Sequence, residues 1–124
     1  MSLTSQQKFA ASLNKGNVQM AKTRDEVIMM IKEYVAELRK NDFDIDSAIL
    51  FGSYAKGDYN DWSDIDVALV SNNFSGNRFI DKEKIRKYNA QFDYMISPMP
   101  FRTSNFTKKD RFVNEILSTG IRII

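Results

Sequence analysis

Residues 48–70, AILFGSYAKGDYNDWSDIDVALV, decide the fold because two apolar runs flank a polar, turn-forming segment. The first run, residues 47–51, ends at Gly52 and predicts a short buried strand. The second run, residues 64–70, alternates in character as a strand with two different faces does. The segment between them should fold back as a loop, since it holds the turn formers Gly57, Asp58, Asn60 and Asp61.

The residues that follow the first predicted strand suit the binding of an anion. Gly52 has no side chain, so the backbone amides there can come close to a bound group. Ser53 can cap a following helical turn, which would leave its hydroxyl and the nearby amides facing an anion. We therefore expect a phosphate cradle at Gly52 and Ser53.

The second predicted strand places two carboxylates on one face. Asp64, Asp66 and Ala68 share that face, and the apolar residues between them share the other. Two carboxylates so close repel each other, and a bound cation explains the pair best; hard oxygen ligands suit magnesium. An anion cradle beside a carboxylate pair is what metal-assisted phosphoryl or nucleotidyl transfer requires.

The spacing of these residues resembles a known signature. Gly52-Ser53, ten further residues and then Asp64-Ile65-Asp66 are similar to the motif of the DNA polymerase β-like nucleotidyltransferase superfamily. The resemblance implies an α+β fold, a two-layer α/β arrangement in which a mixed sheet is flanked by helices. It also implies that Gly52 and Ser53 hold the triphosphate of ATP and that Asp64 and Asp66 bind two magnesium ions.

Two further positions match the small bacterial members, the minimal nucleotidyltransferase (MNT) proteins. Lys56-Gly57 and Ser63 fall where those proteins carry Arg-Gly and Ser, so the resemblance assigns Lys56 and Ser63 to the nucleotide. Lys56 keeps the positive charge of arginine but lacks its planar fork.

A third carboxylate is expected on the strand that follows, and Asp93 is the candidate. Residues 91–97, QFDYMIS, alternate around Asp93 and predict a strand. A charged residue inside an apolar strand needs a partner or a metal. In the resembling family such a residue ligates the metal that activates the acceptor hydroxyl. The alternative is an edge strand with Asp93 in water.

The composition limits the groups that this chain can use for catalysis or metal binding. The chain has 124 residues, enough for one domain, and it contains neither cysteine nor histidine. This excludes disulfides, the usual zinc sites and a Ser-His-Asp triad, and it leaves carboxylates, amines, hydroxyls and metal for catalysis. Residues 41–76 carry one Lys and seven Asp, a balance of −6, whereas residues 77–124 carry a balance of +5. The acidic centre coincides with the predicted metal site.

The remaining elements are predicted from apolar spacing. We expect residues 1–23 to form an arm or short helix and residues 24–124 to form the nucleotidyltransferase domain. A helix at 24–40, capped by Thr23, should bury Val27, Ile31, Tyr34, Val35 and Leu38. A second helix at 81–90 should be anchored by Ile85 and Tyr88, with Arg86 and Lys87 solvated or in contact with phosphate.

The last part of the chain contains two prolines, and residues 98–100 are expected to break regular structure. A helix at 108–119, capped by Thr107, should use Phe112, Val113, Ile116 and Leu117 as its apolar stripe and stop at Gly120. Residues 121–124 predict a final strand. Tyr59 and Trp62 are expected to pack on the core rather than stack on a base.

The acceptor is the open question. The chain is too short for a separate acceptor-binding domain, and small MNT proteins commonly act beside an all-helical HEPN protein as antitoxins that adenylylate the toxin. The leading hypothesis is therefore a magnesium-dependent, ATP-using protein adenylyltransferase of a toxin–antitoxin pair. Its alternatives are a non-catalytic module that neutralises a partner by contact and a homodimeric transferase acting on an antibiotic or another small molecule.

Two classes of partner are disfavoured. No basic groove with interleaved aromatics suggests nucleic acid. The longest apolar runs, such as residues 27–31, are far too short to span a membrane, and the polar N-terminus does not resemble a signal peptide. A cytoplasmic location is the default expectation.

Overall fold

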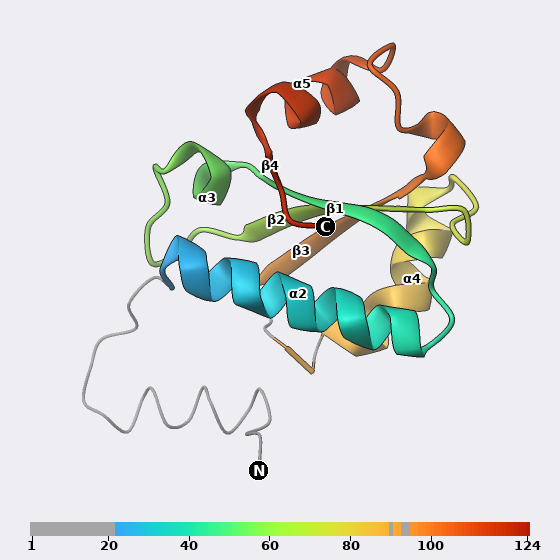
Figure 1. Ribbon diagram of the computed structural model, residues 1–124, viewed down its shortest axis with the longest axis horizontal. Helices are drawn as coiled ribbons and strands as arrows, with labels where there is room; N and C mark the ends of the chain where they lie inside the picture. Colours follow the sequence, from blue (N-terminus) through green and yellow to red (C-terminus); the bar gives the residue numbers. More distant parts are fainter. Residues whose placement is uncertain (1–21, 90, 93–94) are drawn as a thin grey trace.

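The computed structural model describes residues 22–89, 91–92 and 95–124, so Asp93 and almost all of the predicted N-terminal arm lie outside the described residues. The described chain forms a four-stranded sheet in the order β3-β2-β1-β4 (Figure 1). β1 (Ile45–Phe51) pairs antiparallel with both β2 (Ile65–Ser71) and β4 (Ile121–Arg122). β2 pairs parallel with β3 (Ile96–Arg102), which confirms the mixed sheet.

Helices cover both faces of this sheet. α2 (Arg24–Lys40) and α4 (Arg78–Asn89) lie on one face, and α5 (Arg111–Thr119) lies on the other (Figure 1). The four-residue α3 (Ser53–Lys56) follows β1, and a 3₁₀ turn at Thr103–Asn105 follows β3. The predicted α+β class with flanking helices is confirmed, and the short α5 adds a smaller layer opposite α2 and α4. None of the described helices combines the length and the apolar character needed to cross a membrane.

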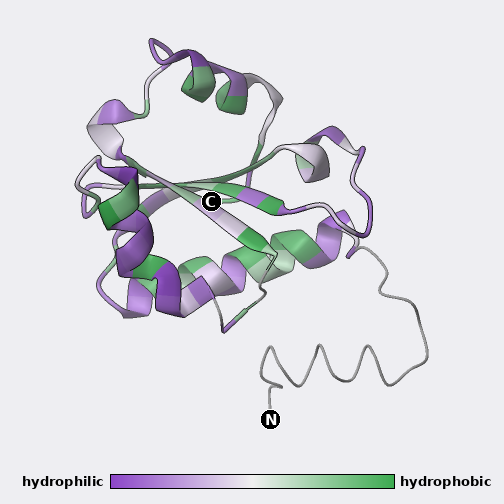
Figure 2. Cartoon of the chain, turned by 180° about the vertical axis from the view of Figure 1, so that it is seen from behind, coloured by the Kyte–Doolittle hydropathy of each residue, from purple (hydrophilic) through white to green (hydrophobic). Residues whose placement is uncertain are grey.

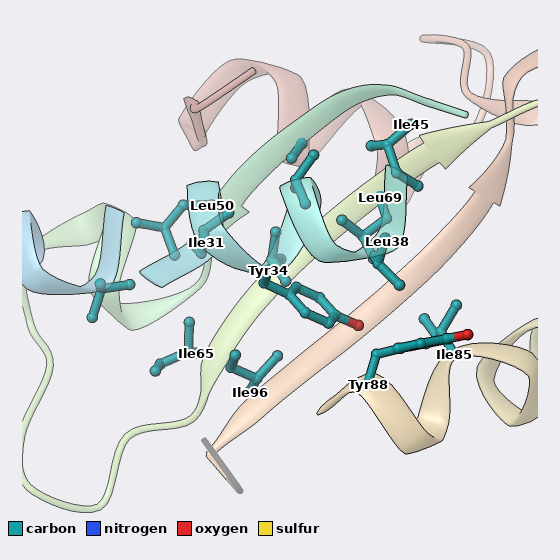
Figure 3. Close-up of a cluster of buried hydrophobic side chains, with 14 of the residues drawn as sticks. Ile31, Tyr34, Leu38, Ile45, Leu50, Ile65, Leu69, Ile85, Tyr88 and Ile96 are labelled. Carbon is teal, nitrogen blue, oxygen red and sulfur yellow. The ribbon is translucent and has the colours of Figure 1, made fainter. Parts of the chain in front are cut away.

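The first helix matches its prediction at both ends. Thr23 is the N-cap, and it forms a reciprocal capping box with Glu26. The buried residues are the five predicted from helical spacing: Val27, Ile31, Tyr34, Val35 and Leu38. Figure 3 shows side chains of this helix meeting those of β1, β2 and α4 in the larger core cluster. Each such buried side chain stabilises the fold by about 1.5–3 kcal/mol relative to exposure.

The period-two alternation of β2 is also confirmed. Ile65, Val67 and Leu69 belong to the core cluster under α2 and α4. Ala68 and Val70 belong to a second cluster, which includes Val113 and Ile116 of α5. Residues two apart in a strand point to the same face of the sheet, so Asp66 lies with Ala68 on the face that α5 partly covers.

The prediction for β3 was wrong in its boundaries. The strand begins at Ile96 rather than at residue 91, and it continues through Pro98 and Pro100, which were expected to break it. β3 lies at the edge of the sheet and pairs only with β2, so alternate backbone positions face away from the ladder and tolerate the loss of an N–H. Residues 91, 92 and 95 lie in turns.

The other boundary errors have capping as their cause. α4 begins three residues before its predicted start, because the side chain of Asn77 accepts hydrogen bonds from the amides of Phe79 and Ile80. α5 begins at Arg111 because Asp110, not Thr107, is its N-cap. Gly120 ends α5 as predicted, whereas Leu117 is exposed and does not belong to the buried stripe.

Candidate active site

The end of β1 and the start of β2 bring the two halves of the predicted motif into contact. Phe51 is paired with Asp66 across the antiparallel ladder, so Gly52 lies beside the Asp66 carboxylate. A Cβ atom at position 52 would lie 2.3 Å from Asp66 Oδ2, and the φ angle of Gly52 is +72°. Both the contact and the backbone conformation require glycine here.

Gly52 then starts the helical turn that the sequence predicts. Its carbonyl accepts hydrogen bonds from the amides of Ala55 and Lys56, each at 3.1 Å. The prediction that Ser53 caps this turn was wrong, since Gly52 occupies the N-cap and Ser53 is the first residue of α3. The positive φ turns the chain at residue 52, one position earlier than a serine cap would.

Arg24 of α2 holds the other end of α3. Its Nε donates to the carbonyl of Tyr54 at 3.0 Å, and its Nη2 donates to the carbonyl of Ala55 at 3.1 Å. These carbonyls belong to the last turn, where a cation interacts favourably with the helix dipole. The sequence analysis missed this role, because nothing in the local pattern links position 24 to a turn about 30 residues away.

The two carboxylates differ in environment. Asp64 is exposed and precedes β2, whereas Asp66 is half-buried within it. Burial raises the pKa of the Asp66 carboxyl above its usual range, and the negative charge of Asp64 raises this pKa further. Among the described residues, neither carboxylate accepts a hydrogen bond or pairs with a cation. Such a pair of hard oxygen donors fits a divalent cation.

The third carboxylate of the prediction is not among the described residues. Within those residues no group of three or more Asp, Glu, His or Cys side chains comes together. β3 nevertheless begins at this level of the sheet, because Ile96 is paired with Ile65 and Ser97 with Asp66. Ser97 therefore lies beside Asp66 on the same face; the sequence analysis missed it because it placed this strand too early.

The family is given by a comparison of the sequence with family models. The nucleotidyltransferase domain model matches residues 28–121. This chain belongs to the nucleotidyltransferase family.

Two relatives agree with this assignment. This nucleotidyltransferase is 34% identical over 103 residues to a protein of Methanocaldococcus jannaschii provisionally named protein adenylyltransferase MJ0141; the match covers 79% of this chain and 99% of that one. It also resembles the crystal structure of a provisionally assigned nucleotidyltransferase from Sulfolobus solfataricus. The TM-score is 0.57 at 22% identity, over 86% of this chain and 90% of the other, which supports the fold.

The loop between α3 and β2 of the nucleotidyltransferase is ordered by its own polar groups. Ser63 Oγ accepts a hydrogen bond from the Asn60 amide at 2.9 Å, and the Ser63 amide donates to the Asn60 carbonyl at 3.1 Å. Tyr59 packs as predicted, stacked on Tyr54 with ring centroids 4.4 Å apart. The same prediction was wrong for Trp62, whose side chain is 82% exposed. Lys56 is exposed at the end of α3.

An open cleft of about 500 Å³ adjoins the carboxylates of the nucleotidyltransferase. It lies between α4 and the start of β3, and Asp64 contributes to its lining. Its lining mixes charged, polar and apolar groups: Asp64, Phe79, Lys82, Glu83, Arg86, Asn89, Met95, Ile96, Ser97 and Pro98. Arg86, for which the sequence suggested a phosphate contact, lines this cleft and not the cradle at Gly52.

Proposed function

We propose that this nucleotidyltransferase transfers AMP from ATP to a hydroxyl group on a protein acceptor, in the first instance a HEPN-type toxin that it would neutralise as an antitoxin. One observation carries the proposal: the backbone at Gly52 lies against the Asp66 carboxylate. A phosphate group held at Gly52 would thus adjoin the metal-binding oxygens. The related protein named as a protein adenylyltransferase supports the choice of AMP and of a protein acceptor.

The donor is held, in this proposal, by the first turn of α3. Gly52 allows the triphosphate to approach the backbone closely, and Ser53 offers its hydroxyl and amide. Lys56 lies one helical turn after Gly52, and its ammonium group would neutralise part of the phosphate charge. Ser63 would act through the loop that it orders with Asn60.

Asp64 and Asp66 would hold magnesium together with Asp93. The donor set fits, because Asp64 and Asp66 present two neighbouring carboxylates that have no counter-charge among the described residues; burial of Asp66, and then the charge of Asp64, raise the pKa of the Asp66 carboxyl. When bound there, the metal would supply positive charge to offset that of the phosphates. The role of Asp93 is assigned from the sequence alone. Asp93 precedes Ile96, which is paired with Ile65, the residue between the two aspartates.

In the proposed reaction one bond forms at the α-phosphorus and one bond breaks. The acceptor oxygen forms a bond to the α-phosphorus of ATP, the bond from that phosphorus to the bridging oxygen breaks, and pyrophosphate leaves. The Asp93 carboxylate would receive the proton of the acceptor hydroxyl. The positioning of the two reactants is the main contribution of the protein, as in other phosphoryl transfers.

Labelled ATP tests this proposal. The protein is incubated with magnesium, a purified HEPN-type protein and ATP labelled on either the α- or the γ-phosphate. We expect label on the HEPN protein from α-labelled ATP only. Asp64→Asn/Asp66→Asn should abolish the transfer, whereas Asp58→Asn/Asp61→Asn, which removes the same charge from the neighbouring loop, should preserve it.

The same assay separates catalysis from neutralisation by contact. If the HEPN protein is neutralised without acquiring label, and the Asp64→Asn/Asp66→Asn variant neutralises it equally well, the transfer proposal is wrong. Label from γ-labelled ATP would instead indicate a kinase activity.

A further inference from the structure

The outer face of α4 is unusual for a surface helix of this size. Its buried side consists of Asp81, Ile85 and Tyr88. Phe79, Lys82 and Arg86 recur at helical spacing on the side that lines the cleft. The Phe79 side chain is 89% exposed, the largest exposed fraction among the large hydrophobic side chains of the described residues. Figure 2 shows α4 as a mainly hydrophilic helix with a hydrophobic block near one end.

The exposed charge of α4 is almost entirely positive. The helix carries five basic residues, Arg78, Lys82, Lys84, Arg86 and Lys87, against two acidic ones, Asp81 and Glu83. Asp81 is fully buried and accepts hydrogen bonds from Ser75 and Gly76, and its carboxylate lies 3.9 Å from the Lys84 ammonium, so it offsets the charge of Lys84 but not that of the other basic residues. Glu83 forms only an exposed pair with Arg86 at 3.5 Å. Of the charged residues of α4, Lys82, Arg86 and Glu83 line the cleft, so the α4 wall of the cleft keeps a net positive charge beside the Phe79 ring, while Asp64, which is opposite in charge, also lines the cleft.

The cleft and the phosphate cradle lie on opposite sides of β2. β2, which carries Asp66, has β1 on one side and β3 on the other. Asp66 is paired with Phe51, next to Gly52, on the first side and with Ser97 on the second. Ser97 and Asp64 line the cleft. A transfer reaction needs its donor and its acceptor on two sides of the reacting phosphorus, and this arrangement offers one surface for each.

We propose that the α4 cleft docks the acceptor, and that the segment it takes is an acidic stretch of polypeptide carrying the hydroxyl to be modified. This inference rests on the proposed transfer from ATP, since it assigns the acceptor side of the same site. Lys82 and Arg86 pair with acidic side chains that flank the hydroxyl, and Phe79 packs on an apolar or aromatic side chain of the segment. The part of the cleft that Asp64 lines receives the hydroxyl.

The acidic peptide fits better than the nucleoside of the donor. The base and the ribose of ATP carry no negative charge that could pair with Lys82 and Arg86. The triphosphate is proposed to bind at Gly52 and Ser53, on the other side of β2. The neighbouring loop, residues 58–64, carries three aspartates and no basic residue, so an acidic segment would be held along α4 rather than over this loop.

Binding of two charged copolymers to the full chain tests the proposal without requiring catalysis. The probes are fluorescein-labelled poly(Glu,Tyr) and poly(Lys,Tyr), which present tyrosine hydroxyls among opposite charges, and the measurement is fluorescence anisotropy at physiological ionic strength. We expect poly(Glu,Tyr) to bind more tightly. Lys82→Ala/Arg86→Ala should weaken its binding about fivefold, the value for two exposed ion pairs.

Two matched variants separate a site from general attraction. Lys84→Ala/Lys87→Ala removes the same charge from other sides of α4 and should change the affinity by less than about twofold; because Lys84 lies 3.9 Å from buried Asp81, thermal unfolding first checks that this variant is folded. Phe79→Ala changes no charge. It should nevertheless weaken binding of poly(Glu,Tyr), because it removes the aromatic side chain that packs on the bound segment. Equal losses in the two double variants, no effect of Phe79→Ala, or tighter binding of poly(Lys,Tyr) would overturn the proposal.

Nucleotide binding is measured on the same variants with a non-hydrolysable ATP analogue and magnesium. Lys82→Ala/Arg86→Ala should leave its affinity unchanged. Loss of nucleotide affinity in this variant would assign the cleft to the donor and overturn the acceptor proposal. Absence of nucleotide binding by the unmodified protein would instead count against transfer from ATP, whatever the copolymers do.

Discussion

At position 52 a methyl group would meet the Asp66 carboxylate and would also be held at a positive φ. We expect Gly52→Ala to destabilise the protein by about 1–3 kcal/mol and to weaken binding of a magnesium–ATP analogue at least about tenfold. Urea unfolding and calorimetry measure the two effects. Gly76→Ala is the matched control: its φ is +95° and its Cβ would lie 2.9 Å from Asn105, far along the chain from the cradle.

The control should lose stability but retain the nucleotide. If Gly52→Ala binds the analogue as tightly as the unmodified protein does, the backbone at residue 52 is not the phosphate cradle.

The raised pKa of Asp66 predicts how stability depends on pH in the absence of metal. A carboxyl whose pKa is higher in the folded state binds more protons when folded, so the free energy of unfolding falls as pH rises from about 4 through the raised pKa. The contribution is constant above that range. Asp66→Asn should remove this dependence and stabilise the metal-free protein at neutral pH, by no more than about 1 kcal/mol.

Urea unfolding in EDTA at several pH values measures this effect, and Asp58→Asn serves as the control. Added magnesium should stabilise the unmodified protein at neutral pH but not the Asp66→Asn variant. A variant that is less stable than the parent without metal would show that the Asp64–Asp66 pair is not a repulsive cation site.

The residues of the motif were predictable because they lie within a short stretch whose period and turn chemistry are local. Gly52, Asp64 and Asp66 could be placed from that stretch alone, and the structure brings them together as expected. Ser97 could not be found in this way, because its position depends on the register of a strand that begins about 30 residues later.

At the scale of elements, α2 supports α3 through one side chain. Arg24→Ala should remove the two hydrogen bonds to the carbonyls of Tyr54 and Ala55 and so loosen the cradle. We expect about a tenfold loss of nucleotide affinity with a loss of stability of about 1–2 kcal/mol.

Arg39 provides a matched control for that variant. It lies on the same helix, and its Nε and Nη2 likewise donate to a backbone carbonyl, that of Ile45, at the other end of β1. Arg39→Ala should lose a similar amount of stability but retain nucleotide affinity. Equal affinities in the two variants would mean that α3 needs no support from Arg24.

The loop before α4 depends on a buried charge. Asp81 is fully buried, and it accepts hydrogen bonds from the Ser75 amide at 2.8 Å, the Ser75 hydroxyl at 3.0 Å and the Gly76 amide at 3.0 Å. Asp81→Ala should destabilise the protein by about 2–3 kcal/mol, because it leaves these donors without their acceptor. Thermal or urea unfolding measures the loss.

Glu83→Ala, on the exposed side of the same helix, should change stability by less than about 0.5 kcal/mol. If the two substitutions have similar effects, the carboxylate of Asp81 does not hold the loop.

In the part of the chain that the structure describes, helical spacing predicted the three longer helices and most of their buried side chains, because the apolar repeat dominates their packing; Leu117 and the buried Asp81 are the exceptions. Boundaries set by single side chains were harder to predict. Asp110 caps α5 where Thr107 was predicted to do so, and the side chain of Asn77 starts α4 before its predicted first residue. β3 was misplaced because prolines usually mark a break, and only the edge position explains why they are tolerated.

For the whole molecule, the fold assembles the site from distant parts of the chain. The sheet order brings the end of β1, the start of β2 and the start of β3 to one region, while α2 and α4 approach it from one face (Figure 1). The acidic middle of the sequence supplies the carboxylates, and the basic last third supplies the α4 side of the cleft. The charge balance along the sequence indicated this division, but only the topology shows that the two meet at Asp64.

The proposed function requires Gly52, Asp64 and Asp66 to form one magnesium–nucleotide site. Isothermal titration calorimetry with α,β-methylene-ATP, in which the scissile bond is blocked, measures binding at this site. We expect binding that requires magnesium, that disappears in Asp64→Asn/Asp66→Asn and that persists in Asp58→Asn/Asp61→Asn. Binding that is independent of magnesium, or equal in the two double variants, would contradict it.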